Sequence, residues 1–392
     1  MKSNQIICIA GQNEIAVNGL KLVIKNFGSS NVVACPNPND LGESNWQPSL
    51  KKFANQFGIQ IMQLEDLYCY KDLVLISLEC SQIIKVEKFK SKKIYNLHFS
   101  LLPAYKGVYT SAWPIINQEK ITGVTIHKVN KKIDGGNILY QKSFSIKKND
   151  TSRDLYFRYS KYGYLLLKKY IYELVKNNFH GLKQNDKLSS YYSKSSINYK
   201  NIKLTLFRNA KNFDSLARAF HFREFQLPKV RDVCIKDGLI KIKKNKTGII
   251  IKKRESIRVS CIDFDIEYKI DRSLEIFQLI KKKKFISAIN LIKRDNSLIN
   301  VTNKNGWSPL MIAAFNGFKI FAEHLIKLGA NVNQANQNGT TVLMYAKEFV
   351  LKKKDFSIFR LLIKHGAKLY KRDKFNKNIF HYLNNKDKLL FK

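Results

Sequence analysis

The sequence predicts an α/β domain with a parallel sheet, then a small β unit, and last an all-α repeat domain. Three observations carry this prediction. Short apolar segments alternate with amphipathic helical patterns through the first hundred residues. Several strand-like segments separated by Lys-rich turns fill residues 230–270. A motif recurs after 33 residues in the last third of the chain. At 392 residues, the chain has room for all three parts.

The first part alternates strands and helices. The expected strands are Ile6–Ala10, Val32–Cys35, Leu73–Leu78 and Ile94–Leu97. An amphipathic helix follows the first strand and ends at Gly28; its apolar positions are Ala16, Leu20, Val23, Ile24 and Phe27. Strand, helix and strand in series imply a parallel sheet covered on both faces. Such a sheet binds ligands at the carboxyl ends of its strands, where the loops starting at Gly11 and Asn96 open.

The middle of the chain changes character twice. A hairpin-like stretch at Thr122–Val129 is followed by the turn Asp134-Gly135-Gly136 and by a long helix over Ser152–Asn178. A further helix is expected at Phe213–Phe222, before Pro228. The short strands expected after it are Val233–Ile235, Leu239–Ile242, Gly248–Ile251, Ile257–Cys261 and Phe264–Tyr268. The predicted domains are therefore residues 1–228, 229–271 and 272–392.

The basic composition is weaker evidence for a polyanionic partner than the size of the net charge implies. Seventy Lys and Arg residues against thirty Asp and Glu give a net charge of +40, which favours nucleic acid binding by default. The bases are mostly Lys spread along the whole chain, together with abundant Asn, Ile, Tyr and Phe. Codons rich in A and T produce that mixture without selection for a ligand. We therefore expect a solvated basic surface, with nucleic acid an unlikely partner.

Other sequence features limit the compartment and the cofactors. No apolar run approaches the ~18 residues that span a bilayer, and the first apolar run is too short for a signal peptide. The six cysteines contain no C-x-x-C pair and are expected to be reduced, without a zinc site. These observations predict a cytoplasmic protein with no membrane contact and no metal.

Asn96, His98 and Asp134 form the constellation with the clearest chemistry. Asn96 and His98 are two residues apart, so at a strand end their side chains face the same way. Asp134 follows about 36 residues later on a turn. An amide can bind a developing oxyanion, an imidazole can move a proton near neutral pH, and a carboxylate can set the imidazole tautomer. No Ser or Cys is placed as a nucleophile, so direct acyl transfer to an amine is the simpler reading.

The patterns around these residues resemble a known enzyme family. The motifs are N-x-H-x-S-x-L-P-x-x-K-G from Asn96, T-G-V-T-x-H from Thr122, and D-x-G from Asp134. In this order they resemble formyltransferases that use N10-formyltetrahydrofolate, over about residues 1–200. The resemblance implies a Rossmann-like fold, with Asn96 binding the formyl oxygen, His98 as general base and Asp134 assisting it. The family's frequent Arg is Lys106 here, which keeps the charge without the fork geometry.

The same resemblance implies where the two substrates bind. It places the pterin beside the strand end at Ser77, Leu78 and Cys80, with Gly136 allowing close backbone approach. Asn13 lies in a G-x-N loop at the start of the first helix and would face the acceptor substrate. The helix around Arg218 and the segment Tyr191–Lys194 resemble features of sugar-nucleotide formyltransferases. The resulting candidates for nucleotide-sugar contacts are Tyr192, Lys194, Tyr199, Lys203 and Arg218.

The last third resembles ankyrin repeats. Asn305–Ala313 is echoed by Asn338–Ala346, and Leu325–Asn331 by Leu362–Lys368. Ankyrin repeats normally bind proteins; structural support or homodimer contacts are the second reading. Trp307 follows Gly306 at a position where side chains tend to be exposed. Among many lysines this ring suggests a third reading, a second nucleotide-sugar site.

The combination of a formyltransferase core with ankyrin repeats resembles sugar N-formyltransferases. It implies dTDP-3-amino-3,6-dideoxy-D-glucose as the acceptor and a formamido sugar destined for the O-antigen of lipopolysaccharide. A dTDP-4-amino sugar and methionyl-tRNA remain alternative acceptors. A non-enzymatic ankyrin adaptor is the alternative from another functional class, but it leaves Asn96, His98 and Asp134 without a role.

Overall fold

The computed structural model describes residues 5–199, 202, 204 and 208–391. The chain divides into two compact units. The first comprises the residues up to Glu43 together with Ser49–Ile270, and the second comprises Ser44–Pro48 together with the residues from Asp271 onward. The α/β fold and the small β unit both belong to the first unit.

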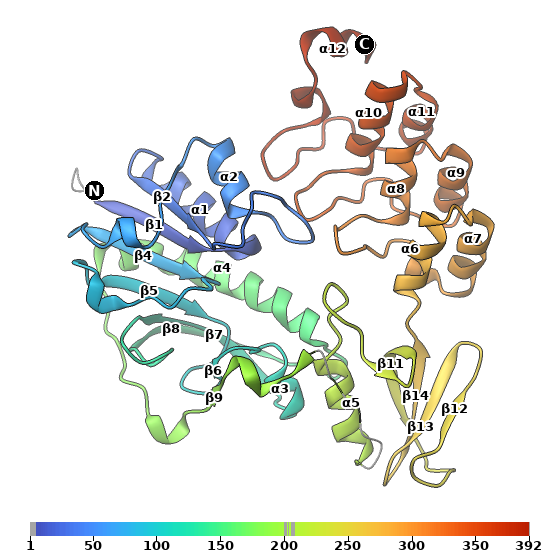
Figure 1. The fold of residues 1–392 in the computed structure, drawn as a ribbon. Coiled ribbons are helices and arrows are strands. Elements are labelled where there is room, and N and C mark those ends of the chain that lie inside the picture. Colours follow the sequence, from blue (N-terminus) through green and yellow to red (C-terminus); the bar gives the residue numbers. More distant parts are fainter. Residues whose placement is uncertain (1–4, 200–201, 203, 205–207, 392) are drawn as a thin grey trace. The chain divides into compact units, whose positions relative to one another are not determined.

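A seven-stranded sheet forms the centre of the first unit (Figure 1). Its strands are β1 Ile6–Gly11, β2 Val32–Pro36, β3 Gln60–Ile61, β4 Leu73–Leu78, β5 Lys93–His98, β7 Ile121–Lys128 and β8 Ile138–Ser145. The order is β3-β2-β1-β4-β5-β7-β8. The first five strands run parallel, and β7 and β8 are antiparallel additions. The predicted parallel sheet is therefore confirmed.

The two faces of this sheet are covered differently. Helices α1 (Asn13–Phe27) and α4 (Ser152–Lys176) pack together against one face. A side chain at Gly163 of α4 would approach Leu97 to 2.8 Å, so glycine there permits close helix–sheet packing. The other face buries Cys8 and Leu75 against residues of the segments 62–70 and 80–89, which contain the 3-10 turns η1 (Glu65–Leu67) and η2 (Val86–Lys88).

Local signals explain the bounds of the two long helices. Helix α1 ends at Gly28, which has φ +80°. Helix α4 begins after Thr151, whose hydroxyl accepts from the Asp154 amide while the Asp154 carboxylate accepts from the Thr151 amide. It ends where Asn177 adopts the left-handed conformation. Two shorter helices are α2 Leu50–Gln56 and α3 Trp113–Ile116.

The small β unit is a five-stranded antiparallel sheet in the order β10-β11-β14-β13-β12. Its strands are β10 Lys229–Val230, β11 Val233–Lys241, β12 Ile250–Lys252, β13 Ser256–Ser260 and β14 Asp265–Ile270. Where two short strands are expected before Lys243, the structure has the single strand β11, because a bulge after Lys236 absorbs the break in the pattern. Helix α5 (Ala210–Ala219) packs Phe213 and Ala217 against this sheet. It begins three residues before the predicted Phe213 because the Asn209 side chain caps its first turn.

The second unit consists of stacked helices, as the ankyrin pattern predicts. The helices are α6 Ser273–Lys281, α7 Phe285–Arg294, α8 Pro309–Asn316, α9 Lys319–Lys327, α10 Val342–Lys353, α11 Ser357–Lys364 and α12 Asn385–Leu390. The equivalent residues Ser308 and Thr341 cap α8 and α10 by accepting from the amides of Met311 and Met344. Leu325 and Leu362 are fully buried in one shared core.

Within the described residues, no helix combines the length and the apolar character needed to cross a lipid bilayer. All six cysteines are free thiols.

Candidate active site

The catalytic candidates meet at the carboxyl ends of neighbouring parallel strands. Asn96 and His98 end β5, and Ser77 on β4 is the register partner of Asn96. Asp134 comes from the loop that joins β7 to β8. The structure thus brings together three residues spread over 38 positions, because β5 and β7 pair directly and the β7–β8 loop carries Asp134 to the end of β5.

The Asn96 amide is held in one orientation. Its Oδ1 accepts a hydrogen bond of 2.7 Å from the Ser77 hydroxyl, which leaves Nδ2 to donate. Nδ2 lies 3.1 Å from His127 Nε2 and 3.3 Å from Asp134 Oδ1. The longer contact is the weaker hydrogen bond, so it is the one that an incoming carbonyl oxygen replaces most readily.

His98 is almost completely buried, with 8% of its side chain exposed. Its Nδ1 lies 3.5 Å from Asp134 Oδ2, and its Nε2 lies 2.8 Å from the Tyr105 carbonyl oxygen. A carbonyl oxygen only accepts, so Nε2 carries a hydrogen in this conformation. For Nε2 to take a proton, His98 must break its contact with the Tyr105 carbonyl oxygen and contact the substrate instead. Tyr105 itself has a positive φ of +60°, which is strained for a residue with a side chain.

The Asp134 carboxylate accepts hydrogen bonds and faces two imidazoles. The Gly107 amide donates to Oδ2 over 2.9 Å, and His127 Nε2 lies 3.4 Å from Oδ1. Burial alone would raise the pKa of this carboxyl group. The charge of His98 and the hydrogen bond from the Gly107 amide outweigh burial and lower the pKa well below its usual value. Asp134 therefore stays ionised at neutral pH.

His127 is a functional candidate that the site prediction missed. It is 1% exposed, and its Nδ1 lies 3.0 Å from the Lys128 carbonyl oxygen. Nδ1 therefore carries the hydrogen, and Nε2 is free to accept from Asn96. The signal was present in the sequence, since His127 closes the T-G-V-T-x-H motif.

Glu79 is a second residue that the prediction missed. It follows β4 directly and has φ +59°. Its Oε2 accepts from Tyr156 over 2.9 Å and from Asn13 Nδ2 over 3.2 Å. Burial raises the pKa of Glu79 to about 7, against the lowering effect of these two hydrogen bonds. No sequence pattern marks Glu79, because its partners come from helices α1 and α4 and only the fold brings them to this strand end.

Among the described residues, no group of three His, Cys, Asp or Glu side chains lies together in a way that could hold a metal ion. The side chains that meet at the strand ends supply an amide, imidazoles and a carboxylate.

Comparison with known proteins identifies this arrangement. The family model for formyl transferases matches residues 47–171, and a model of three ankyrin repeats matches residues 276–373. An N-formyltransferase from Helicobacter canadensis, solved with folinic acid and dTDP-3-aminofucose, is 41% identical with a TM-score of 0.65. The match covers 68% of this chain and 100% of that one. The chain belongs to the formyltransferase family.

Other formyltransferases match over smaller or comparable regions. WlaRD, described as a sugar 3N-formyl transferase and solved with dTDP and 5-N-formyl-THF, is 41% identical with a TM-score of 0.64, over 68% of this chain and 97% of that one. The bifunctional polymyxin resistance protein ArnA of Wigglesworthia glossinidia brevipalpis is 31% identical over 240 residues, 60% of this chain. A methionyl-tRNA formyltransferase of Ureaplasma urealyticum is 32% identical over 205 residues, 51% of this chain. The chain spans 36% and 64% of the lengths of these last two proteins.

In this formyltransferase, the residues expected to bind the formyl donor have structural partners of their own. Ser77 is buried and orients Asn96. The Leu78 carbonyl accepts from the Gln12 amide over 3.2 Å. The half-buried Cys80 thiol contacts the Gln82 carbonyl. A Cβ atom at Gly136 would lie 1.6 Å from the Lys128 carbonyl oxygen. The backbone that leaves no room for a side chain at Gly136 is therefore the end of β7.

The nucleotide candidates are brought together only in part. Tyr192 stacks with Trp113 at 4.1 Å and with Tyr105 at 5.7 Å between ring centroids, so its ring already has near-parallel neighbours. Tyr199 packs edge-on against Tyr109, and the Lys194 carbonyl accepts from the Tyr109 hydroxyl. Tyr192 thus lies with Trp113 and Tyr105, whereas Lys194 and Tyr199 share Tyr109 as their partner. Lys203 lies outside the described residues.

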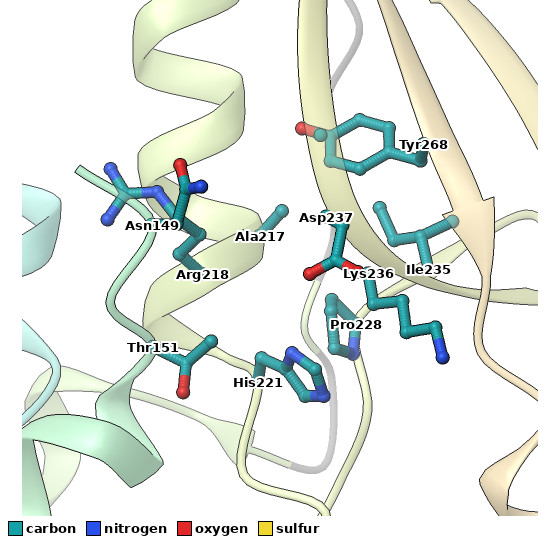
Figure 2. Close-up of a pocket in the computed structure, with 11 residues that line it drawn as sticks. Asn149, Thr151, Ala217, Arg218, His221, Pro228, Ile235, Lys236, Asp237 and Tyr268 are labelled. Carbon is teal, nitrogen blue, oxygen red and sulfur yellow. The ribbon is translucent and has the colours of Figure 1, made fainter. Parts of the chain in front are cut away.

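Arg218 has an evident structural role. Its Nε donates to Asp214 over 2.7 Å and its Nη1 to the Asp150 carbonyl over 2.9 Å. Figure 2 shows the pocket that Arg218 lines with His221 and Asp237, between α5 and the start of β11. The pocket volume of about 30 Å³ suits an ordered water and is far smaller than a nucleotide site. None of its lining residues belongs to the Asn96–His98–Asp134 cluster.

Trp307 is half-buried, whereas the sequence suggested an exposed ring. It packs 4.6 Å from Tyr345 and 5.2 Å from Phe315, between ring centroids. The neighbouring repeat supplies Tyr345, and the stacking of repeats therefore covers part of the indole.

Proposed function

We propose that this chain transfers the formyl group of N10-formyltetrahydrofolate to the amine of a dTDP-linked amino sugar. The observation that carries the proposal is the cluster of Asn96, His98 and Asp134 at the strand ends. It lies in a domain that matches two sugar N-formyltransferases over almost their whole lengths. One of them was solved with dTDP-3-aminofucose, and the other is described as a sugar 3N-formyl transferase. Both relatives support a 3-amino acceptor, and we propose dTDP-3-amino-3,6-dideoxy-D-glucose.

The side chains supply the parts of a direct transfer. The acceptor amine attacks the formyl carbon, and the Asn96 amide donates a hydrogen bond to the oxygen that becomes negatively charged. His98 takes a proton from the attacking nitrogen and returns it to the departing N10 nitrogen as the C–N10 bond breaks. The Asp134 carboxylate, 3.5 Å from Nδ1, stabilises the imidazolium formed between the two steps.

Mass spectrometry of the reaction products tests this proposal. The purified chain is mixed with N10-formyltetrahydrofolate and either the 3-amino or the 4-amino dTDP sugar, in gluco and galacto forms. We expect a gain of one formyl group on the 3-amino gluco sugar, and none with His98→Asn. Formylation of the 4-amino sugar alone would overturn the proposed position of the amine, and absence of product with all the sugars would overturn the class of acceptor.

Methionyl-tRNA is the competing acceptor, because several curated relatives carry that name. Contacts with several phosphates make binding strongly dependent on salt. We expect kcat/KM with the amino sugar to change little between 50 and 200 mM salt, and no formylation of methionyl-tRNA at either concentration.

The residues around the site complete the proposal. Ser77, Leu78, Cys80 and Gly136 would line the formyl donor, mainly through backbone groups. Asn13, Tyr192, Lys194, Tyr199, Lys203 and Arg218 would contact the nucleotide sugar. The six free thiols support a reducing compartment, so we place the reaction in the cytoplasm, where it would supply a formamido sugar for the O-antigen of lipopolysaccharide.

For the ankyrin unit, protein binding remains our first proposal, with homodimer contacts as the alternative. A second nucleotide-sugar site at Trp307 is tested by equilibrium dialysis with the nucleotide sugar. Two bound molecules in the wild type and one in Trp307→Ala would support that site, and equal stoichiometry in both would exclude it.

A further inference from the structure

The carboxylate of Glu79 lies at the same edge of the sheet as the catalytic histidine. In the register between β4 and β5, Leu78 is level with Leu97, so the residues that follow, Glu79 and His98, occupy adjacent strand ends. The Tyr156 ring, whose hydroxyl contacts Glu79, lies 6.1 Å from Phe99, a residue that alternates with His98 and packs on the helix-covered face of the sheet. The strand register therefore places Glu79 beside His98 at the carboxyl edge of the sheet, with its side chain held by residues of α1 and α4.

Neutral donors hold this carboxylate on one side only. Tyr156 and Asn13 both donate to Oε2, and they lie 3.0 Å from each other. The backbone of Glu79 is also fixed, since its carbonyl accepts from Asn37 Nδ2 over 3.0 Å. Within the described residues, no protein donor is bonded to Oε1, and no Lys, Arg or His nitrogen lies within 4 Å of the carboxylate. The residue as a whole is partly buried, and Oε1 is not among the described side-chain atoms that are buried without a hydrogen-bond partner.

The other titratable groups around Glu79 do not neutralise it. Tyr156 faces it from α4, and Glu14 at the start of α1 adds a negative charge near Tyr156. Cys80 follows Glu79 in the chain, and His98 is the neighbouring imidazole. A carboxylate with a preorganised orientation, an available oxygen and no cationic partner is suited to a cationic ligand.

We propose that Glu79 binds the ammonium form of the acceptor amine through Oε1 and removes one proton from it before attack on the formyl group. This inference rests on the proposed transfer to an amine. In the step, an N–H bond breaks, its electron pair remains on nitrogen as the nucleophilic lone pair, and an O–H bond forms at Glu79. The proton later leaves Glu79 for water, while His98 moves the second proton from the attacking nitrogen to N10. The third hydrogen stays on the formamide, so the protons balance.

The proposal explains why two bases are needed. An amine beside electron-withdrawing groups has a pKa near 8, like a peptide α-amino group, so most of it is cationic at pH 7. His98 is already committed to the proton that moves during transfer. The raised pKa of Glu79, about 7, allows its carboxylate to accept a proton near neutral pH and to release it again.

The deciding experiment compares kcat/KM of the full chain and of Glu79→Gln between pH 6 and 9.5. We expect the variant to be about 10-fold slower at pH 6.5, because only about 3% of an amine with a pKa near 8 is unprotonated there. At pH 9 the free amine dominates, and the two rates should agree within about 2-fold. Glu65→Gln, an exposed carboxyl change in the same unit, is the matched control and should follow the wild type throughout.

A loss in Glu79→Gln that is equal at every pH would overturn the proposal, because a residue that only positions the sugar does not distinguish the two forms of the amine.

If Glu79→Gln does not fold, Tyr156→Phe provides the same test. Loss of the Tyr156 hydroxyl raises the pKa of Glu79 further, so the acidic limb of the kcat/KM profile should move to higher pH. The control is Tyr172→Phe on the same helix α4, which removes a hydroxyl bonded to Asn26 and should leave that limb in place. A Tyr156→Phe profile whose acidic limb does not move counts against Glu79.

Failure of the proposed function gives a different result. In that case the wild type formylates none of the amino sugars, whereas failure of the Glu79 proposal leaves an active wild type and a loss in the variant that is equal at every pH.

Discussion

The Nδ1 atom of His98 lies 3.5 Å from Oδ2 of Asp134, which joins the end of β5 to the loop between β7 and β8. The same Asp134 carboxylate accepts from the Gly107 amide and faces Asn96 through its other oxygen. One buried anion therefore joins the segment around Gly107 and the β7–β8 loop to the strand end that carries the oxyanion donor and the base. Its pKa is well below neutral, so its charge is constant over the range in which an enzyme of this kind is assayed.

Loss of this charge should remove most of the activity. We expect Asp134→Asn to lower kcat at least ~10²-fold, as should His98→Asn, because the imidazolium loses its counter-charge in one case and the base is absent in the other. The rate at which each variant forms the formamido sugar provides the measurement. Asp237→Asn, an exposed carboxyl on β11, is the control. Rates close to wild type in both active-site variants would contradict the assignment of the base.

His127 should act through the orientation of Asn96. Replacement by Leu removes the acceptor 3.1 Å from the Asn96 amide, and we expect kcat to fall about 10-fold with little change in KM. His127→Gln restores a side-chain acceptor and should recover part of this loss. Single-turnover rates distinguish the variants. Equal rates in Leu and Gln variants would show that the position matters only for packing.

Gly136 should be far less tolerant of a side chain than a glycine at an open turn. A Cβ atom at Gly136 meets the Lys128 carbonyl oxygen at 1.6 Å, whereas Gly58 has φ +62° and no neighbour within 4 Å. We expect Gly136→Ala to lower the free energy of unfolding by at least about 3 kcal/mol. For Gly58→Ala we expect about 1–2 kcal/mol from backbone strain alone. Urea unfolding followed by circular dichroism measures both, and a loss at Gly136 no larger than at Gly58 would contradict the close approach.

The raised pKa of Glu79 also predicts a stability that depends on pH. A glutamate carboxyl group with a folded pKa of about 7, well above its ordinary value, disfavours the folded state once it must ionise. The protonated Glu79 therefore costs the folded state nothing at low pH, and the free energy of unfolding falls as pH rises through 7 and the group ionises. Glu79→Gln cannot ionise and should be more stable than the wild type at pH 8 by about 1–3 kcal/mol, with little difference below pH 5. Chemical denaturation at the two pH values decides the matter, and a constant difference would contradict the shifted pKa.

The sequence by itself determined the order of the parts and much of their local structure. Apolar runs predicted β1, β2, β4 and β5, and the cap residues Gly28, Ser308 and Thr341 marked helix ends, because these signals act within a few residues. Asn96, His98 and Asp134 were singled out because motif spacing and strand period are local properties too. The sequence predicts two strands where the structure has the single bulged strand β11, since alternation alone does not show that a partner strand continues past a bulge.

Tertiary structure alone decided which side chains share a crevice. Glu79 is 66 positions from Asn13 and 77 from Tyr156, and parallel pairing with helix packing brings them together. Contacts between distant segments also place near-parallel rings beside Tyr192 and cover part of Trp307. They pair Arg218 with the Asp214 carboxylate and with the Asp150 carbonyl oxygen. Burial and contact between distant segments set the pKa of Glu79 and of Asp134, and no local pattern in the chain records either quantity.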